Sequence, residues 1–144
     1  MWAVRITPTY LLSMSKPYIH AEASVRRYGG KLEDYLPLHE LMDSSKMAFP
    51  SNIHRTMTHN SWFAKEIIPK CFGDTIVNSN NKRVSTEQLA TDHILEDFHG
   101  RFVPSVQDYL EHMIPQPWFD EGKGEPPSSC KRLLTKQTKP IHND

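Results

Sequence analysis

Residues 85–100 read STEQLATDHILEDFHG and carry both the start and the stop signals of a helix. Ser85 and Gln88 form a capping box, in which each side chain satisfies a backbone group of the first turn. Leu89, Ile94 and Leu95 supply apolar positions along the segment, and Gly100 provides the left-handed residue that ends many helices. This segment therefore predicts a helix over residues 86–99.

The flanking sequence adds further helices and one hairpin. Gly29-Gly30 ends a helix predicted over residues 18–28, and Pro37, as a first-turn proline, begins one over 38–49. A third helix is predicted over 53–72, kinked near Pro69, and a short one over 106–113. Residues 75–84 predict a small β-hairpin around a polar turn. The predicted fold is mainly α, a compact bundle of about five helices with one small β-hairpin.

The two ends of the chain differ from its middle. The segment Met14-Ser15-Lys16-Pro17 is a natural opening for a domain, which makes residues 1–13 an N-terminal extension and leaves either Met1 or Met14 as the native start. From Pro115 onward the chain holds five of its eleven prolines among polar residues. We therefore expect one helical domain over 14–114, followed by a disordered, Pro-rich C-terminal tail over 115–144.

Composition restricts the possible partners and the location. Seventeen basic and seventeen acidic residues cancel, whereas nucleic-acid binders are usually basic, so nucleic acid is an unlikely partner. No apolar run approaches the length of about 20 residues that crosses a bilayer. The two cysteines, Cys71 and Cys130, are too few for a disulfide framework. These features predict a cytoplasmic protein that spans no membrane.

Two segments share the spacing His-x-x-x-Asp, namely His39/Asp43 and His93/Asp97. Residues four apart lie on one face of a helix, so each pair places an imidazole beside a carboxylate. His59 lies in a third histidine-containing segment, whereas His54 would point about 140° away from it on a continuous helix. Nitrogen and oxygen ligands of this kind suit zinc, manganese or iron. The predicted metal ligands are His39, Asp43, His59, His93 and Asp97.

Three further side chains complete a hydrolytic hypothesis. Arg55 and Lys46 would bind an anion such as phosphate, and Glu96 would act as the catalytic base. A bound ion would make a water acidic enough to attack a phosphate-containing substrate. The alternative is a non-enzymatic interaction or inhibitor protein, in which the His/Asp residues form a structural polar network. Its contacts would come from the tail, the Trp62/Phe63 or Trp118/Phe119 aromatics, or the 78–81 turn with Lys82-Arg83. Whether the protein is an enzyme stays open at this point.

A series of short motifs resembles a known family. The chain carries, in this order, KPYIH at 16–20, DYLPLH at 34–39, DSSK at 43–46, HRTMTHNS at 54–61, DHILED at 92–97 and VPSVQDYL at 103–110. Together they resemble a small bacterial and phage family known only as a domain of unknown function. The resemblance covers about residues 14–114 and implies that they form one unit. It implies no established activity.

Overall fold

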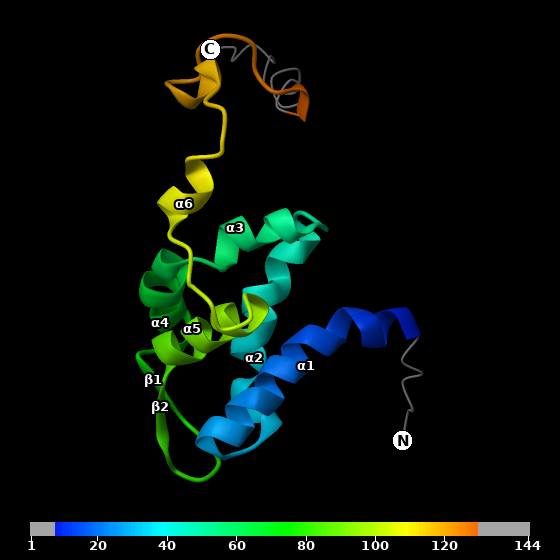
Figure 1. The fold of residues 1–144 in the computed structure, drawn as a ribbon, viewed down its shortest axis with the longest axis vertical. Helices are drawn as coiled ribbons and strands as arrows, with labels where there is room; N and C mark the ends of the chain where they lie inside the picture. The colour runs from blue at the N-terminus through cyan, green and yellow to red at the C-terminus, as the bar shows by residue number, and fades with distance from the viewer. Residues whose placement is uncertain (1–7, 130–144) are drawn as a thin grey trace, which may run out of the picture. The chain divides into compact units, whose positions relative to one another are not determined.

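The computed structural model describes residues 8–129, with side chains from residue 17 onward, and divides into two units between Glu111 and His112. The first unit contains all the named helices and strands (Figure 1). The second contains a 3₁₀ turn, Pro117–Phe119. The tail predicted over 115–144 lies outside the described residues from 130 onward, as do residues 1–7 of the predicted extension.

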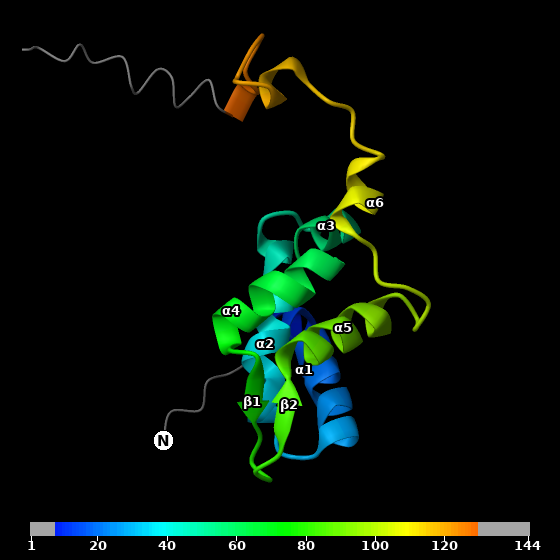
Figure 2. The ribbon, with the colours of Figure 1, turned by 90° about the vertical axis from the view of Figure 1, so that its left-hand side faces the viewer.

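The first two helices, α1 (Pro8–Tyr28) and α2 (Leu32–Asp43), lie side by side (Figures 1 and 2). Both differ from the prediction. α1 begins earlier and continues through Pro17, although a proline removes one backbone donor there. α2 begins at Leu32 rather than Leu38, because Asp34 accepts a hydrogen bond from the Lys31 backbone N–H (2.7 Å) and caps the helix six residues before the predicted start. A 3₁₀ turn, Ser44–Met47, follows α2 directly.

The third predicted helix is wrong as a single element. The chain forms a 3₁₀ turn (Asn52–His54), α3 (Arg55–Thr58), a π-helical turn (Phe63–Ile67) and α4 (Ile68–Phe72). It breaks at Asn60, whose side-chain oxygen accepts from the Phe63 backbone N–H (2.8 Å) and whose amide donates to the Thr56 carbonyl (3.0 Å). Asn60 thus caps a new helical segment instead of continuing the old one.

The remaining elements follow the prediction more closely. Strands β1 (Thr75–Val77) and β2 (Arg83–Ser85) form the antiparallel hairpin, and Ser85 caps α5 (Thr86–Asp97) by accepting from the Gln88 backbone N–H at 3.1 Å. α6 (Val106–Leu110) is shorter than predicted. The mainly α fold with one hairpin is therefore confirmed.

The hairpin turn is tied to the α1–α2 connection, which lies at the same end of the unit (Figure 2). Asp34 accepts from both the backbone N–H and the hydroxyl of Ser79, each at 2.8 Å. Gly30 has a φ of 82°, and a Cβ on it would lie 2.5 Å from an Asp34 oxygen and 3.0 Å from the Asn78 Cβ. Only glycine fits this close approach.

The hydrophobic core lies between α1, α2, α4, β2 and α5. Its largest fully buried apolar side chains are Tyr35, Leu38, Met42, Ile68, Leu89 and Ile94. The same interior holds an unusual number of buried polar side chains, among them the histidines His20, His39, His54, His59 and His93. A buried polar group costs folding free energy unless it is hydrogen-bonded. The hydrogen-bond partners of these histidines therefore indicate the role of the buried polar residues.

Candidate metal centre

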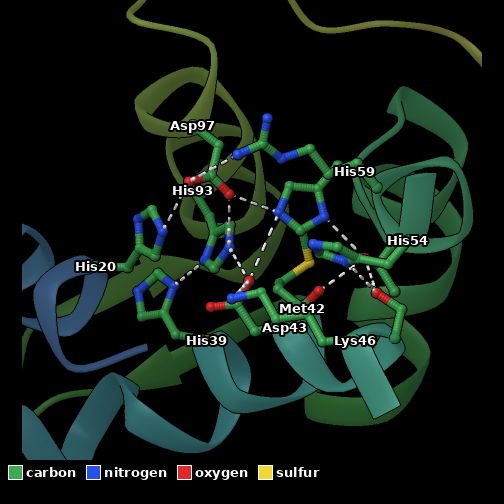
Figure 3. A network of polar contacts seen from close by, with 12 residues as sticks. His20, His39, Met42, Asp43, Lys46, His54, His59, His93 and Asp97 are labelled. Atoms are coloured by element: carbon green, nitrogen blue, oxygen red, sulfur yellow. Dashed lines mark hydrogen bonds and ion pairs between the residues drawn. The ribbon is translucent and has the colours of Figure 1, made fainter. Parts of the chain in front are cut away.

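Four side chains bring one ligand atom each to a common point, and we call them the four-residue cluster: Asp43, His59, His93 and Asp97 (Figure 3). These atoms all lie within 4.8 Å of one another. The His59 Nε2 is 2.7 Å from Asp97 Oδ2 and 3.8 Å from Asp43 Oδ1. The His93 Nε2 is 3.3 Å from Asp43 Oδ1 and 3.6 Å from Asp97 Oδ2. A tetrahedron with zinc bonds of about 2.0–2.1 Å has edges of about 3.3–3.4 Å, within this range.

Local structure explains how three segments reach this point. Asp43 is the last residue of α2, and His93 and Asp97 are four apart on α5. His59 follows the last residue of α3 and leaves helical geometry, with φ −98° and ψ 59°. The Tyr109 hydroxyl donates to the His59 carbonyl at 2.8 Å and fixes the backbone there. The break at residues 59–60, absent from the prediction, therefore aims the His59 ring at α5.

A chain of hydrogen bonds determines the tautomer of His93. The Ser24 hydroxyl donates to the His20 carbonyl (3.1 Å), so it must accept from the Nε2–H of His39 (2.8 Å). Burial, with a smaller effect from His93, places the pKa of His39 far below its usual value, so this ring is neutral and its Nδ1 is an acceptor. That Nδ1 lies 2.8 Å from the Nδ1 of His93, which is therefore the donor. The His93 lone pair then sits on Nε2, facing the cluster.

A second chain fixes His59 in the same way. The Thr58 hydroxyl donates to the Met42 carbonyl (2.7 Å), so its oxygen accepts from the His59 Nδ1–H (2.8 Å). It also accepts from Ser45 (3.0 Å), which in turn accepts from the Nδ1 of His54 (2.8 Å). A neutral His59 consequently carries its lone pair on Nε2, 2.7 Å from a carboxylate oxygen.

The carboxylates of the cluster are held in their charged form. Burial would raise the pKa of Asp97, but the hydrogen bond from the protonated His20 and the close contact with His59 outweigh it and hold that pKa far below its usual value. Burial would likewise raise the pKa of Asp43, but the close contact with His93 and the charge of Lys46 outweigh it and lower that pKa. The second oxygen of Asp43, Oδ2, is buried and has no hydrogen-bond partner among the described residues. A buried carboxylate oxygen of this kind calls for a bound cation or another donor.

His20 extends the network on the α1 side, to the left in Figure 3. Its Nδ1 bonds to Glu96 and its Nε2 lies 3.3 Å from Asp97 Oδ1. Burial by itself would lower the pKa of His20, but the bonds to Asp97 and Glu96 prevail and raise that pKa to about 9. A protonated His20 therefore holds Asp97 so that its other oxygen faces the cluster.

The predicted site residues fall into three groups. The cluster contains four of the five predicted ligands, whereas His39 lies behind His93 and bonds to it. Lys46 Nζ lies 3.7 Å from Asp43 Oδ1, and an Arg55 guanidinium nitrogen lies 4.0 Å from Asp97 Oδ1. Glu96 lies outside the cluster, with one oxygen bonded to His20 and the other to Arg27 at 2.5 Å.

Sequence reasoning missed several of these residues and misjudged one. His20 and Ser24 entered no predicted site, because their partners lie far along the chain: 76 residues separate His20 from Glu96. Thr58 could have been found, since it directly precedes His59. His54 entered no predicted site because it would point away from His59 on a continuous helix, yet it is only 2% exposed and has Ser45 as a hydrogen-bond partner in the interior.

The aromatic residues of the interaction hypothesis show mixed exposure. Trp62 is half exposed, whereas Phe63 packs against the core. Trp118 and Phe119 contact each other within the second unit, at 4.4 Å between ring centroids. Asn78 of the hairpin turn is buried and donates to the Tyr28 carbonyl, so it serves the fold rather than a partner.

Comparison with known proteins adds a family. Residues 15–119 match the family described as Domain of unknown function (DUF6915), in agreement with the resemblance inferred from the sequence motifs. The chain belongs to DUF6915. No curated protein and no solved structure matches it. The matched range of this DUF6915 domain includes the whole four-residue cluster. Within residues 8–129, none of the helices combines the length and the apolar character needed to cross a bilayer.

Proposed function

We propose that this DUF6915 domain binds one divalent transition-metal ion through Asp43, His59, His93 and Asp97. One observation carries the proposal. Two hydrogen-bond chains that end on backbone carbonyls direct the Nε2 lone pairs of His59 and His93 toward two ionised carboxylates. Lone pairs and anionic oxygens repel one another at 2.7–3.8 Å, and a cation between them turns that repulsion into four bonds.

The chemistry of the donors supports this proposal. Two carboxylates balance the charge of a divalent ion, and imidazole with carboxylate suits zinc, manganese and iron. Each ligating imidazole donates its other nitrogen proton, His59 to Thr58 and His93 to His39. Such outer partners orient the ring and raise its basicity as a ligand.

The rival explanation is a polar network that only fixes the packing of the helices. In that case His59 would have to carry a second proton, donated to Asp97, and the buried Asp43 Oδ2 would stay without a partner among the described residues. An unpaired buried oxygen lowers the free energy of unfolding by about 1–3 kcal/mol or more. A network that only fixes helix packing would bear this cost without any gain.

Hydrolysis of a phosphate-containing substrate is the finer proposal, favoured by the cations beside the carboxylates. Lys46 and Arg55 both lie next to the cluster, and the Arg55 Nε is buried without a hydrogen-bond partner among the described residues. A metal ion supplies an acidified water. The water oxygen would bond to phosphorus while the ester P–O bond breaks and the leaving oxygen takes the proton. Glu96, with both oxygens engaged, would hold His20 in place rather than act as the base.

Coordination number separates a structural role from a hydrolytic one. Four protein ligands complete a tetrahedral site, whereas a six-coordinate ion keeps two positions for water and substrate. We would add Co²⁺ to metal-free protein purified without a histidine tag and record the visible spectrum. We expect saturation at one equivalent, with weak bands if the ion is six-coordinate and intense bands if it is four-coordinate.

Two controls make this titration decisive. His93→Ala should remove the saturable bands, while His99→Asn, a change at an exposed histidine outside the cluster, should keep them. Wild-type protein with no saturable Co²⁺ spectrum, or a His93→Ala spectrum equal to that of wild type, would refute metal binding at the cluster. Intense four-coordinate bands would refute the hydrolytic version alone.

A further inference from the structure

A cavity of about 330 Å³ lies beside the four-residue cluster, between α1 and α5. Ile19 and Ala23 form its apolar wall, and Arg26 and Arg27 lie on the next turn of α1. From α5, Asp97 closes the cavity on the side of the cluster. Small-molecule sites have volumes of about 300–1,000 Å³, so this cavity suits a ligand at the small end of that range.

Asp97 belongs both to the cavity and to the cluster. Its Oδ2 faces the ligand atoms of His59 and His93, while its Oδ1 lies 3.3 Å from His20, which also lines the cavity. A molecule in the cavity is therefore separated from the proposed ion by a single carboxylate group.

The two arginines of the cavity differ in whether their side chains are paired with a carboxylate. Arg27 is paired with Glu96 at 2.5 Å and lies 3.8 Å from Asp92. Arg26 has an exposed side chain and no ion-pair or hydrogen-bond partner within the described part of the chain. A guanidinium group presents paired donors that match the oxygens of a phosphate. Arg26 is thus the cation available to a ligand, whereas Arg27 balances the charge of Glu96, which also lines the cavity.

We propose that this cavity binds a small phosphomonoester, the substrate class of the metal centre, with its phosphate on Arg26 and its organic group against Ile19 and Ala23. The inference rests on the proposed function, because the ligand is placed where one carboxylate joins it to the ion. It differs from the prediction made from sequence, in which Lys46 and Arg55 bind the anion. In Figure 3 Lys46 lies across the cluster from His20 and so on a different side of the site from the cavity, whereas Arg55 lies 4.0 Å from Asp97 Oδ1.

The test uses phenyl phosphate, which combines a phosphate with an apolar ring, and the full chain loaded with Mn²⁺. Binding is followed by titration calorimetry, and the ³¹P line width reports whether the phosphate lies close to the paramagnetic ion. Arg26→Gln is compared with Arg83→Gln, which removes the same charge from an exposed position on the hairpin. Ile19→Ala tests the apolar wall, with inorganic phosphate as a second probe. Manganese content is measured in every sample.

We expect wild-type protein to bind phenyl phosphate with marked ³¹P broadening. Arg26→Gln should weaken binding about 10-fold or more, the effect of one charge-assisted contact, and Arg83→Gln less than twofold. Ile19→Ala should weaken phenyl phosphate but not inorganic phosphate.

The outcomes that refute the inference are distinct from those that refute metal binding. Fully loaded protein that does not bind phenyl phosphate, or binds it without broadening, refutes the cavity assignment alone. Equal affinities of Arg26→Gln and Arg83→Gln do the same. Protein that takes up none of manganese, zinc and iron refutes the proposed function and this inference together.

Discussion

At Ser24 and Thr58, one hydroxyl proton determines the protonation of a histidine in the cluster. Each hydroxyl donates to a backbone carbonyl, which can only accept, so each oxygen is left to accept from an imidazole. The Nε2 lone pairs of His93 and His59 follow from this constraint. Hydrogen bonding alone therefore directs both Nε2 lone pairs toward the cluster, as the proposed metal site requires.

His39 provides a test of this assignment, because it hydrogen-bonds to the proposed ligand His93 and is not itself a proposed ligand. His39→Ala removes the acceptor of the His93 Nδ1–H while leaving all four ligands. Loss of such an outer partner weakens metal binding by about 10–100-fold. Competition with a chromophoric chelator would measure the change, with His99→Asn as the matched control. A change below twofold, or a loss as complete as in His93→Ala, would contradict the assigned role.

Among the elements, the break between α3 and the π-helical turn matters most for the site. A continuous helix over residues 53–72 would carry His59 in regular geometry. Instead, Asn60 caps the next segment, and the backbone of His59 leaves the helix. The site thus depends on an interruption, not on a regular helical face.

Asn60→Ala should therefore affect both stability and metal binding. It removes an N-cap, which costs about 0.5–2 kcal/mol of the free energy of unfolding, and loosens the segment that aims His59. Urea unfolding and chelator competition would measure the two effects. Asn52→Ala, at an exposed position, should change neither. An Asn60→Ala protein with wild-type metal affinity would show that the break does not position His59.

The sequence predicts some elements of this fold well and others poorly, for physical reasons. α5 was predictable because its cap at Ser85, its apolar positions and its glycine stop are all local. The start of α2 is harder to predict, because Pro37 has the signature of a first-turn residue while the actual cap, at Asp34, lies upstream of it. The break at Asn60 had a local signal, since asparagine is a preferred N-cap.

Some residues of the candidate site are likewise predictable from local sequence, whereas others depend on tertiary packing. The spacing of His93 and Asp97 places both on one face of α5, and the same spacing in α2 brings Asp43 to the cluster but leaves His39 behind His93. The role of His20 had no signal in the sequence, because only tertiary packing brings it to Glu96 and Asp97.

From the shifted pKa values of the buried histidines, we expect the metal-free protein to be most stable near pH 6.5. Burial lowers the pKa values of His54 and His93 to about 4, although the nearby Asp43 carboxylate acts to raise that of His93. The unfolded chain, with ordinary pKa values of about 6.5, then binds more protons, so stability falls as the pH drops from 6.5 toward 4. The pKa of His20 is raised to about 9, so its contribution is complete below 6.5 and is lost as the pH rises through 9.

Denaturant unfolding in the presence of a chelator would measure this profile. The pH values would run from about 4.5 to about 9.5, which is about two units below to three units above the unperturbed pKa of histidine. We expect His20→Gln to remove the decline on the alkaline side while keeping the acid side. Stability that rises steadily from pH 6.5 to 9 in the wild-type chain would contradict the assigned charge state of His20.

The central claim is that folding brings α2, α3 and α5 together around one divalent ion. It is tested most directly by the metal content of the full chain, purified without an affinity tag and measured by elemental mass spectrometry, with circular dichroism confirming that each variant is folded. We predict one divalent transition-metal ion per chain in the wild type and in His99→Asn, and none in His59→Ala or His93→Ala. Folded wild-type protein without stoichiometric metal after incubation with zinc, manganese and iron, or equal metal content in His59→Ala and wild type, would contradict the claim.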